Sequence, residues 1–321
     1  MITQIAEIKR FIGNTPVKKL NLPESEASLY AKLEYYNLTG SVKDRPAVHI
    51  MGKAVENGLI NKDTYVVEST SGNFGIALAT VCKSIGVRFI PVLDPNTSPE
   101  KEKMLKLLSH RIIHVTERDE TGGFLLNRIK AVEEFKAKNA NTFHPNQYEN
   151  PNNYGSYSLS LAEEIIRDFP RLDYLFVSVS SGGTIVGLAK RLKQHYPSVK
   201  IVPVDVSGSL IFSSMPGIRH IPGLGSGKRC IFLDEVDLEE CMILHEEKIV
   251  EGCQSLLKEQ NLFAGGSSGA VYYAAREYLT AHARAGEKGL IICPDRGNDY
   301  INTIYNPAWI EEKYHSEHAV I

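Results

Sequence analysis

Four predicted junctions between a strand and a helix carry the residues whose types are best suited to chemistry. In open α/β sheets, ligands bind beyond the carboxyl ends of the strands, where helix N-termini present free N–H groups. The four junctions read NLTGSVKDRPA at 37–47, ESTSGNFGIALA at 68–79, VSVSSGGTIVGLA at 177–189 and FAGGSSGAVYYAA at 263–275. We expect a small-molecule site where they meet.

Lys43 of the first junction enters the first turn of a predicted helix. Its charge opposes the helix macrodipole, so this position lowers the pKa of the ammonium and favours the neutral amine. Schiff-base chemistry requires a neutral amine. Taken alone, the residue is also explained as a solvated lysine paired with Asp44.

The second and fourth junctions place hydroxyl and amide side chains at predicted helix starts. Thr70, Ser71 and Asn73 surround Gly72, where the helix N-terminus is suited to hold a carboxylate. Ser267 is the first hydroxyl of the fourth junction. In isolation, an ordinary N-cap also explains each of these positions.

The third junction offers a nest of backbone N–H groups and hydroxyls suited to a phosphate monoester. Its residues are Ser180, Ser181, Gly182, Gly183 and Thr184. It is not a P-loop, because the GxxxxGK[ST] pattern is absent and the Gly-Lys pair at 227–228 is followed by Arg229. No GxGxxG follows a predicted strand, which argues against a dinucleotide site.

Short β-branched apolar runs alternate with longer amphipathic stretches, which predicts βαβ units and a mostly parallel sheet in an α/β fold. The predicted strands are LYAKLEY, TYVVEST, VRFIPVLD, RIIHV, YLFVSVS, KIVPVDV and GLIICP. The predicted helices cover 43–57, 73–85, 99–109, 124–138, 155–168, 184–196, 243–259, 268–283 and 298–305.

The length of 321 residues favours two domains. A stretch rich in Asn, Tyr and Pro at 144–157 marks the main predicted division. We expect an N-terminal domain over 36–150 that carries Lys43 and a C-terminal domain over 151–321 that carries the third junction, joined by the segment 1–35. A second irregular stretch at 207–229 is long for a loop inside a compact domain, which is typical of a functional loop.

The net charge of −2 gives no basic surface for nucleic acid or for an acidic membrane. No apolar run approaches the ~20 residues needed to span a bilayer, and the N-terminus lacks the pattern of a secretion signal. The five cysteines form neither a CxxC pair nor a zinc pattern. We therefore expect a cytoplasmic protein with reduced thiols, small-molecule partners and no metal.

From IGNTPVKKL at 12–20 to PDRGNDY at 294–300, the chain resembles the cysteine synthase and cystathionine β-synthase group of pyridoxal-phosphate enzymes. The order and spacing of all four junctions match that group. The resemblance implies the tryptophan synthase β fold, fold type II, with two three-layer αβα domains and a mobile substrate-closing subdomain in the N-terminal one. It also implies pyridoxal 5'-phosphate as the cofactor and a homodimer.

The resemblance further implies roles for individual residues. Lys43 resembles the Schiff-base lysine, Asn73 the residue that hydrogen-bonds the cofactor's phenolic oxygen, and Ser267 the hydroxyl at its pyridine nitrogen. The resemblance also implies which residues hold the cofactor phosphate. This group, here called the phosphate cup, consists of Ser181, Gly182, Gly183 and Thr184. By the same resemblance, the substrate α-carboxylate is expected to bind Thr70, Ser71, Asn73 and Gln147. Gln147 is also explained as an amide that orders its loop.

Ser267 bears on the reaction that we expect. A neutral hydroxyl cannot hold a protonated pyridinium as a carboxylate would, so the ring is a weaker electron sink and long-lived carbanions are disfavoured. This favours a transferase that eliminates a β-substituent, leaving an α-aminoacrylate to which a second nucleophile adds. Lys43 is then the general base that removes the α-proton.

Within the group, three features resemble the synthases of staphyloferrin B siderophore biosynthesis: Phe74 where threonine is usual, the SVKDRPA loop, and Arg128 in TGGFLLNRI at 121–129. Those enzymes join O-phospho-L-serine to L-glutamate, giving N-(2-amino-2-carboxyethyl)-L-glutamate, a precursor of 2,3-diaminopropionate. A phosphate leaving group and a dicarboxylate nucleophile need cationic partners. The candidates are Arg128, Arg219, Lys228 and Arg229, each of which is also explained as a solvated surface charge.

Other functions stay open on the sequence. A cysteine synthase would join O-acetylserine or O-phosphoserine to sulfide and would need none of these cations. A binding protein that kept the fold and lost catalysis would not need Lys43. An NAD-dependent dehydrogenase has the right class of sheet but not the glycine fingerprint.

Overall fold

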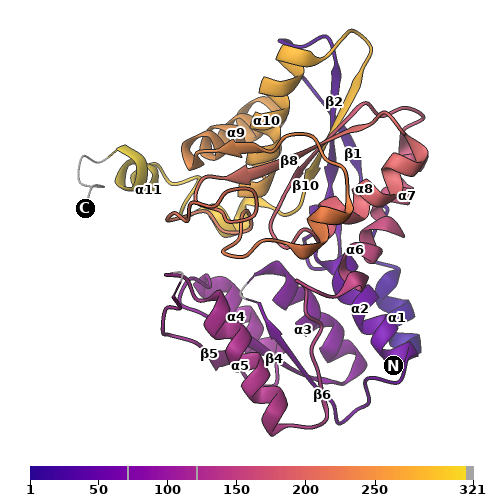
Figure 1. Cartoon of the computed structure of the whole chain (residues 1–321), viewed down its shortest axis with the longest axis vertical. Helices are drawn as coiled ribbons and strands as arrows, with labels where there is room; N and C mark the ends of the chain where they lie inside the picture. The colour runs from indigo at the N-terminus through magenta and orange to yellow at the C-terminus, as the bar shows by residue number, and fades with distance from the viewer. Residues whose placement is uncertain (71, 121, 316–321) are drawn as a thin grey trace.

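The computed structural model describes residues 1–70, 72–120 and 122–315 and contains two sheets with helices packed on them (Figure 1). The six-stranded sheet has the order β1-β2-β10-β7-β8-β9 and the four-stranded sheet has the order β5-β4-β3-β6. All pairs are parallel except β1 with β2, which confirms the predicted α/β fold with mostly parallel sheets. The strands are β1 (Val17–Leu20), β2 (Ser28–Leu33), β3 (Tyr65–Ser69), β4 (Arg88–Leu93), β5 (Ile113–His114), β6 (Thr142–Phe143), β7 (Tyr174–Ser178), β8 (Lys200–Val206), β9 (Met242–Leu244) and β10 (Lys288–Cys293). The helices are α1 (Ile2–Lys9), α2 (Asp44–Glu56), α3 (Asn73–Ile85), α4 (Pro99–Leu108), α5 (Leu125–Lys138), α6 (Pro151–Ser158), α7 (Leu161–Asp168), α8 (Gly183–His195), α9 (Glu246–Gln260), α10 (Gly266–His282) and α11 (Pro307–Ile310).

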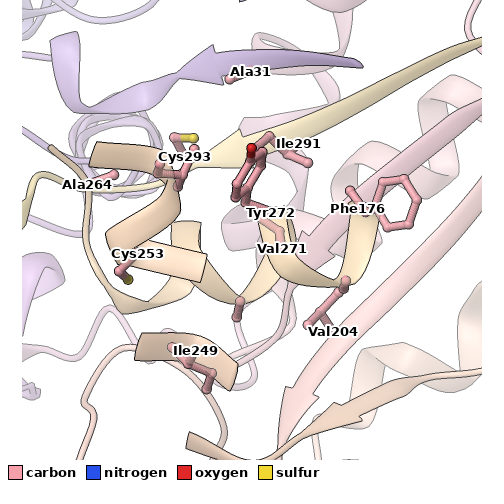
Figure 2. Close-up of a cluster of buried hydrophobic side chains, with 14 of the residues drawn as sticks. Ala31, Phe176, Val204, Ile249, Cys253, Ala264, Val271, Tyr272, Ile291 and Cys293 are labelled. Carbon is pink, nitrogen blue, oxygen red and sulfur yellow. The ribbon is translucent and has the colours of Figure 1, made fainter. Parts of the chain in front are cut away.

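The central strands of the six-stranded sheet are buried on both faces, because alternate side chains point to opposite sides. Phe176 of β7 and Val204 of β8 pack with Ile249 of α9 and Val271 of α10 in one core cluster (Figure 2). Leu175 belongs instead to the cluster formed with α7 and α8 on the other face. This two-sided burial explains why these strands are continuous apolar runs in the sequence.

The four-stranded sheet is built in the same way. Val66 of β3 and Phe89 of β4 belong to a cluster with α1, α2 and α3. Val67 and Ile90, the next residues along these strands, belong to a cluster with Val132 of α5. The helices therefore cover both faces of the smaller sheet, with α5 on the side away from α1 and α2 (Figure 1).

Two of the predicted helices are wrong. The stretch 155–168 is broken between α6 and α7, where the Ser160 hydroxyl donates to the Ser156 carbonyl at 2.6 Å, a back-bond that bends helices. The stretch 298–305 contains only a 3₁₀ turn, η3 (Gly297–Tyr300), followed by further turns. Tertiary contacts override local helix propensity there, because Tyr300 is buried and the Tyr305 hydroxyl donates to the Ala264 carbonyl.

The fourth junction also differs from its prediction. It follows α9 rather than a strand, and its only β contact among the described residues is an isolated bridge between Ala264 and Arg296. α1 and the short strands β1, β6 and β9 were not predicted from the sequence, because each offers few periodic residues. The domain boundaries drawn from the sequence stay a prediction. Within the ranges that the structure describes, no helix is long and apolar enough to cross a membrane.

Candidate functional site

A cavity of 220 Å³ lies where the N-termini of four helices and several loops from both sheets converge. α2 and α3 bring residues from the first two junctions, and the turns before α8 and α10 bring the other two. The predicted site residues that line this cavity are Lys43, Thr70, Asn73, Arg128, Gln147, Ser181, Gly182, Thr184 and Ser267. Gly183 begins α8 directly beside them. Ser71 and Thr121 lie outside the described residues.

Lys43 is the N-cap residue of α2, and its own N–H donates to the Ser41 hydroxyl at 3.2 Å. Burial lowers the pKa of the Lys43 ammonium to about 8, although the nearby carboxylate of Asp295 acts in the opposite direction. Asp44 does not pair with Lys43, because its carboxylate accepts from the Thr39 N–H at 2.8 Å and from the Thr39 hydroxyl at 2.7 Å. The simpler explanation of Lys43 as a solvated lysine paired with Asp44 is therefore wrong.

The turn before α8 has a backbone that accepts no side chain at two positions. Gly182 has a φ of +79°, and a Cβ there would lie 2.1 Å from Cys230 Sγ. A Cβ on Gly183 would lie 2.4 Å from Asn153 Oδ1. The first N–H groups of α8 have no carbonyl partner within the helix and border the cavity beside Ser181. This arrangement fits a phosphate group.

Asn73 and Ser267 are not helix caps. The N-caps of α3 and α10 are Gly72 and Gly265, and no side chain that the structure describes caps either helix. Asn73 Nδ2 donates to Asp295 Oδ2 at 2.8 Å, and the Ser267 hydroxyl donates to the Gly223 carbonyl at 3.0 Å. Ser267 thus fastens the irregular 207–229 stretch to the wall of the cavity.

Gln147 does order its loop, since its Nε2 donates to the Ser69 carbonyl at 3.2 Å, but it also lines the cavity. The structure therefore shows the loop-ordering contact of Gln147, and its role at the substrate carboxylate stays a prediction. Thr70 directly follows β3, is 3% exposed, and lines the cavity.

Arg128 of α5 is the one cation among the four candidates that lines the cavity. It is 8% exposed, and its Nε lies 3.2 Å from Asp94 Oδ2. Lys228 pairs with Glu149 at 2.8 Å at the surface, and Arg229 pairs with Asp234. Arg219 is also absent from the described lining, and burial lowers its pKa.

Several further residues that line the cavity were not predicted as site residues, among them Lys101, Tyr148, Asp295 and Tyr300. Tyr148 adjoins Gln147, while Asp295 and Tyr300 belong to the PDRGNDY segment, so their neighbourhood carried a signal although their roles did not. Lys101 reaches the site from α4 and pairs with Asp299 Oδ2 at 3.0 Å. That pair joins α4, which connects β4 and β5 of the four-stranded sheet, to the turn that follows β10 of the six-stranded sheet.

Comparisons with known proteins agree with this architecture. The family model described as "Pyridoxal-phosphate dependent enzyme" matches residues 8–295. An N-(2-amino-2-carboxyethyl)-L-glutamate synthase of Ralstonia nicotianae is 38% identical over 302 residues, which cover 93% of this chain and 89% of that protein.

The solved structures with a similar fold include enzymes whose names contain an O-substituted serine. The O-acetylserine-dependent cystathionine β-synthase of Helicobacter pylori has a TM-score of 0.87 at 30% identity, covering 93% of this chain and 98% of the other. O-ureido-L-serine synthase has a TM-score of 0.86 at 29% identity, covering 97% of each chain.

Proposed function

The chain belongs to the family of pyridoxal-phosphate dependent enzymes and is a β-substituted alanine synthase of fold type II, and from this premise we propose its substrates. The proposed reaction joins O-phospho-L-serine to L-glutamate. The β-carbon of the serine loses phosphate and gains a bond to the amine nitrogen of glutamate. The products are N-(2-amino-2-carboxyethyl)-L-glutamate and inorganic phosphate, as in a pathway to 2,3-diaminopropionate and siderophores.

We propose that the cavity residues hold the cofactor at each of its polar groups. Lys43 bonds its aldehyde as a Schiff base, and Asn73 hydrogen-bonds its phenolic oxygen. Ser267 contacts its pyridine nitrogen, and the phosphate cup of Ser181, Gly182, Gly183 and Thr184 holds its phosphate. The glycine backbone of the cup supports this assignment, because side chains are excluded where N–H groups must approach an anion closely.

Pyridoxal phosphate, when bound, supplies an electron sink that makes the α-proton of an amino acid acidic. Lys43 would take that proton as general base, and its pKa of about 8 leaves a useful fraction of neutral amine near neutral pH. Ser267 offers the ring nitrogen a neutral hydroxyl instead of a carboxylate, which favours β-elimination over longer-lived carbanion chemistry. The site is therefore suited to β-replacement.

The α-carboxylate of the amino-acid substrate is proposed to bind Thr70, Ser71, Asn73 and Gln147. Thr70, Asn73 and Gln147 border the cavity together at the start of α3, where the helix dipole favours an anion. Gln147 is 9% exposed and is held by the Ser69 carbonyl, so its amide is already ordered.

Arg128 is the observation that carries the choice of substrate. Phosphoserine brings a leaving group of about −1.5 to −2 charges, which a guanidinium can bind through several donors. Arg128 is a buried cation at the cavity wall, where its charge is weakly screened. The name of the relative that is 38% identical supports the same reaction.

A cysteine synthase that uses sulfide is the second candidate. It is favoured by the structural similarity to an O-acetylserine-dependent enzyme. Sulfide is small and needs no cationic site for a nucleophile carboxylate. The presence of Arg128 at the cavity weighs against this alternative.

The test is to incubate the cofactor-loaded protein with O-phosphoserine and glutamate. We expect stoichiometric release of phosphate and a product whose mass shows a new C–N bond between the serine β-carbon and the glutamate nitrogen. O-acetylserine with sulfide serves as the matched reaction of the alternative. Efficient cysteine formation without any condensation product would exclude the proposal.

We also propose that the protein works as a homodimer, as the resemblance to its family implies, and that it works in the cytoplasm. All five cysteines are free and four are buried, which is typical of a reducing compartment. Light scattering after size exclusion would measure the oligomeric state, and a monomer that turns over substrate would exclude the dimer.

A further inference from the structure

Asp295 lies where three segments of the cavity wall meet. It forms an antiparallel bridge with Ser41, and the neighbouring Val42 N–H donates to the Pro294 carbonyl at 2.8 Å. The Gly265 N–H donates to the Asp295 carbonyl at 3.1 Å. The backbone at Asp295 therefore holds both the turn that carries Lys43 and the turn that carries Ser267.

The side chain of Asp295 reaches the third segment. Its Oδ2 accepts from Asn73 Nδ2 at 2.8 Å and from the Tyr300 hydroxyl at 3.1 Å. An ionised carboxylate only accepts hydrogen bonds, so it selects the NH₂ end of the Asn73 amide. One N–H is then fixed on Asp295, and the other is directed away from it as a donor. A flipped amide would bring its carbonyl oxygen against the carboxylate.

The structure does not fully satisfy this carboxyl group. Asp295 is 5% exposed, and its Oδ1 has no hydrogen-bond partner among the described residues. Burying a carboxylate with an unpaired oxygen is unfavourable, whereas a neutral side chain would fill the same space without this cost. Retaining the charge in a cavity wall is typical of a functional group.

The charge of Asp295 also acts on Lys43. Burial lowers the pKa of the Lys43 ammonium, and Asp295 raises it, so the carboxylate offsets part of the desolvation. Burial raises the pKa of Asp295 itself, and Lys101 lowers it. The titratable groups that face Asp295 from the elements around it are Lys43, Lys101, Cys253, Cys293, Asp299, Tyr300 and Tyr305.

We infer that Asp295 is a positioning residue for the cofactor, one that fixes the donor end of the Asn73 amide and supplies the negative charge beside Lys43. The inference rests on the proposed function, which assigns Asn73 to the cofactor's phenolic oxygen and Lys43 to its aldehyde. Asp295 acts through these two residues and does not itself bond the cofactor.

The first test is a double-mutant cycle on cofactor affinity. The cofactor-free protein is titrated with pyridoxal phosphate for the wild type, Asp295→Asn, Asn73→Ala and the double variant. We expect Asp295→Asn to weaken binding by about tenfold, the scale of one reoriented hydrogen bond. The double variant should lose less affinity than the two single losses added together, because the amide through which Asp295 acts on the phenolic oxygen is already gone in Asn73→Ala.

Asp205→Asn is the matched control. Asp205 is likewise a buried aspartate at the end of a strand of the same sheet, it is 1% exposed, and its Oδ2 also lacks a hydrogen-bond partner among the described residues. It is absent from the described lining of the cavity. Asp205→Asn should therefore leave cofactor affinity unchanged even where it changes thermal stability.

The second test measures the pH dependence of Lys43 acylation in the cofactor-free protein. Removing the negative charge of Asp295 disfavours the ammonium, so Asp295→Asn should move the midpoint of labelling to lower pH. Asp205→Asn should not move it. Asp295→Ser provides a smaller neutral side chain, and its thermal unfolding shows whether the fold persists.

The outcomes separate the two claims. If Asn73→Ala weakens cofactor binding while Asp295→Asn and Asp295→Ser change neither the affinity nor the Lys43 midpoint, the positioning role is wrong and the proposed function stands. If Asn73→Ala also leaves the affinity unchanged, the assignment of Asn73 in the proposed function fails, and the positioning role fails with it.

Discussion

Arg45 and Glu164 form a bidentate ion pair in the protein interior. Arg45 Nη1 donates to Glu164 Oε1 at 2.8 Å, and Nη2 donates to Oε2 at 3.0 Å. Glu34 accepts two further bonds from the same guanidinium, at 2.6 and 2.8 Å. Arg45 lies two positions after Lys43, so this network fixes the start of α2 against α7 and the end of β2.

Arg45→Met should destabilise the protein by ~3–5 kcal/mol, because it leaves two buried carboxylates without their main partner. Urea unfolding followed by circular dichroism would measure the loss. Arg276→Met is the matched control, since Arg276 pairs with Glu24 at 2.7 Å near the surface and should cost less than about 1 kcal/mol. A similar cost for both variants would contradict the account.

Glu164 predicts a loss of stability in acid. Burial raises the pKa of this carboxyl, but hydrogen bonds from Arg45 and the charges of Arg45 and Lys32 outweigh burial and lower the pKa to about 2. Because the folded pKa lies below the unfolded value of about 4.3, the stabilisation is present above that value and is lost as the pH falls towards 2. Unfolding free energies measured across this window should fall more steeply for the wild type than for Glu164→Gln.

Gly182→Ala should weaken cofactor binding strongly, because the new Cβ would meet Cys230 Sγ and the residue would have to leave a φ of +79°. Gly58→Ala imposes the same kind of backbone strain at a φ of +69° but meets nothing within 4 Å. Both variants should lose about 1 kcal/mol of stability from the left-handed backbone. Spectrophotometric titration with pyridoxal phosphate should show weaker binding for Gly182→Ala than for Gly58→Ala. Equal affinities would contradict the assignment of the phosphate cup to the turn before α8.

Arg128→Ala should weaken use of O-phosphoserine by ~1.5–3 kcal/mol in kcat/KM, the scale of a hydrogen bond to a charged group. O-acetylserine has no phosphate to bind and should lose less. The variant also leaves Asp94 without its ion-pair partner, so Arg128→Ala with Asp94→Asn is the control for that buried charge. An equal loss for the two substrates would assign Arg128 to a structural role.

The sequence indicated which residues line the cavity where a single local segment supplies them. Glycine and serine at the starts of α3, α8 and α10 were visible because backbone N–H exposure and tight turns demand those residue types. Asp295 was not visible as a partner of Asn73, because the two are 222 residues apart and either is an ordinary polar residue in isolation. Contacts of this kind depend on tertiary packing.

The buried ion network was missed for a related reason. Lys32, Arg45 and Glu164 are of types that are mostly exposed in proteins, and nothing local marks them as interior. The loss of the predicted helix at 298–305 also follows from a side-chain contact with a distant segment. The break between α6 and α7 has a local cause, the bond from the Ser160 hydroxyl to the Ser156 carbonyl. The central predicted strands were recovered because burial on both faces leaves a continuous apolar run.

The most direct test of the account is to reduce the cofactor-loaded protein with borohydride and map the modified lysine by mass spectrometry. We expect pyridoxyl phosphate to be attached to the peptide that contains Lys43, and Lys43→Ala to retain some cofactor but turn over no substrate. Lys101 is the internal comparison, since it lines the same cavity and pairs with Asp299. Attachment at Lys101, or near-normal turnover by Lys43→Ala, would contradict the account.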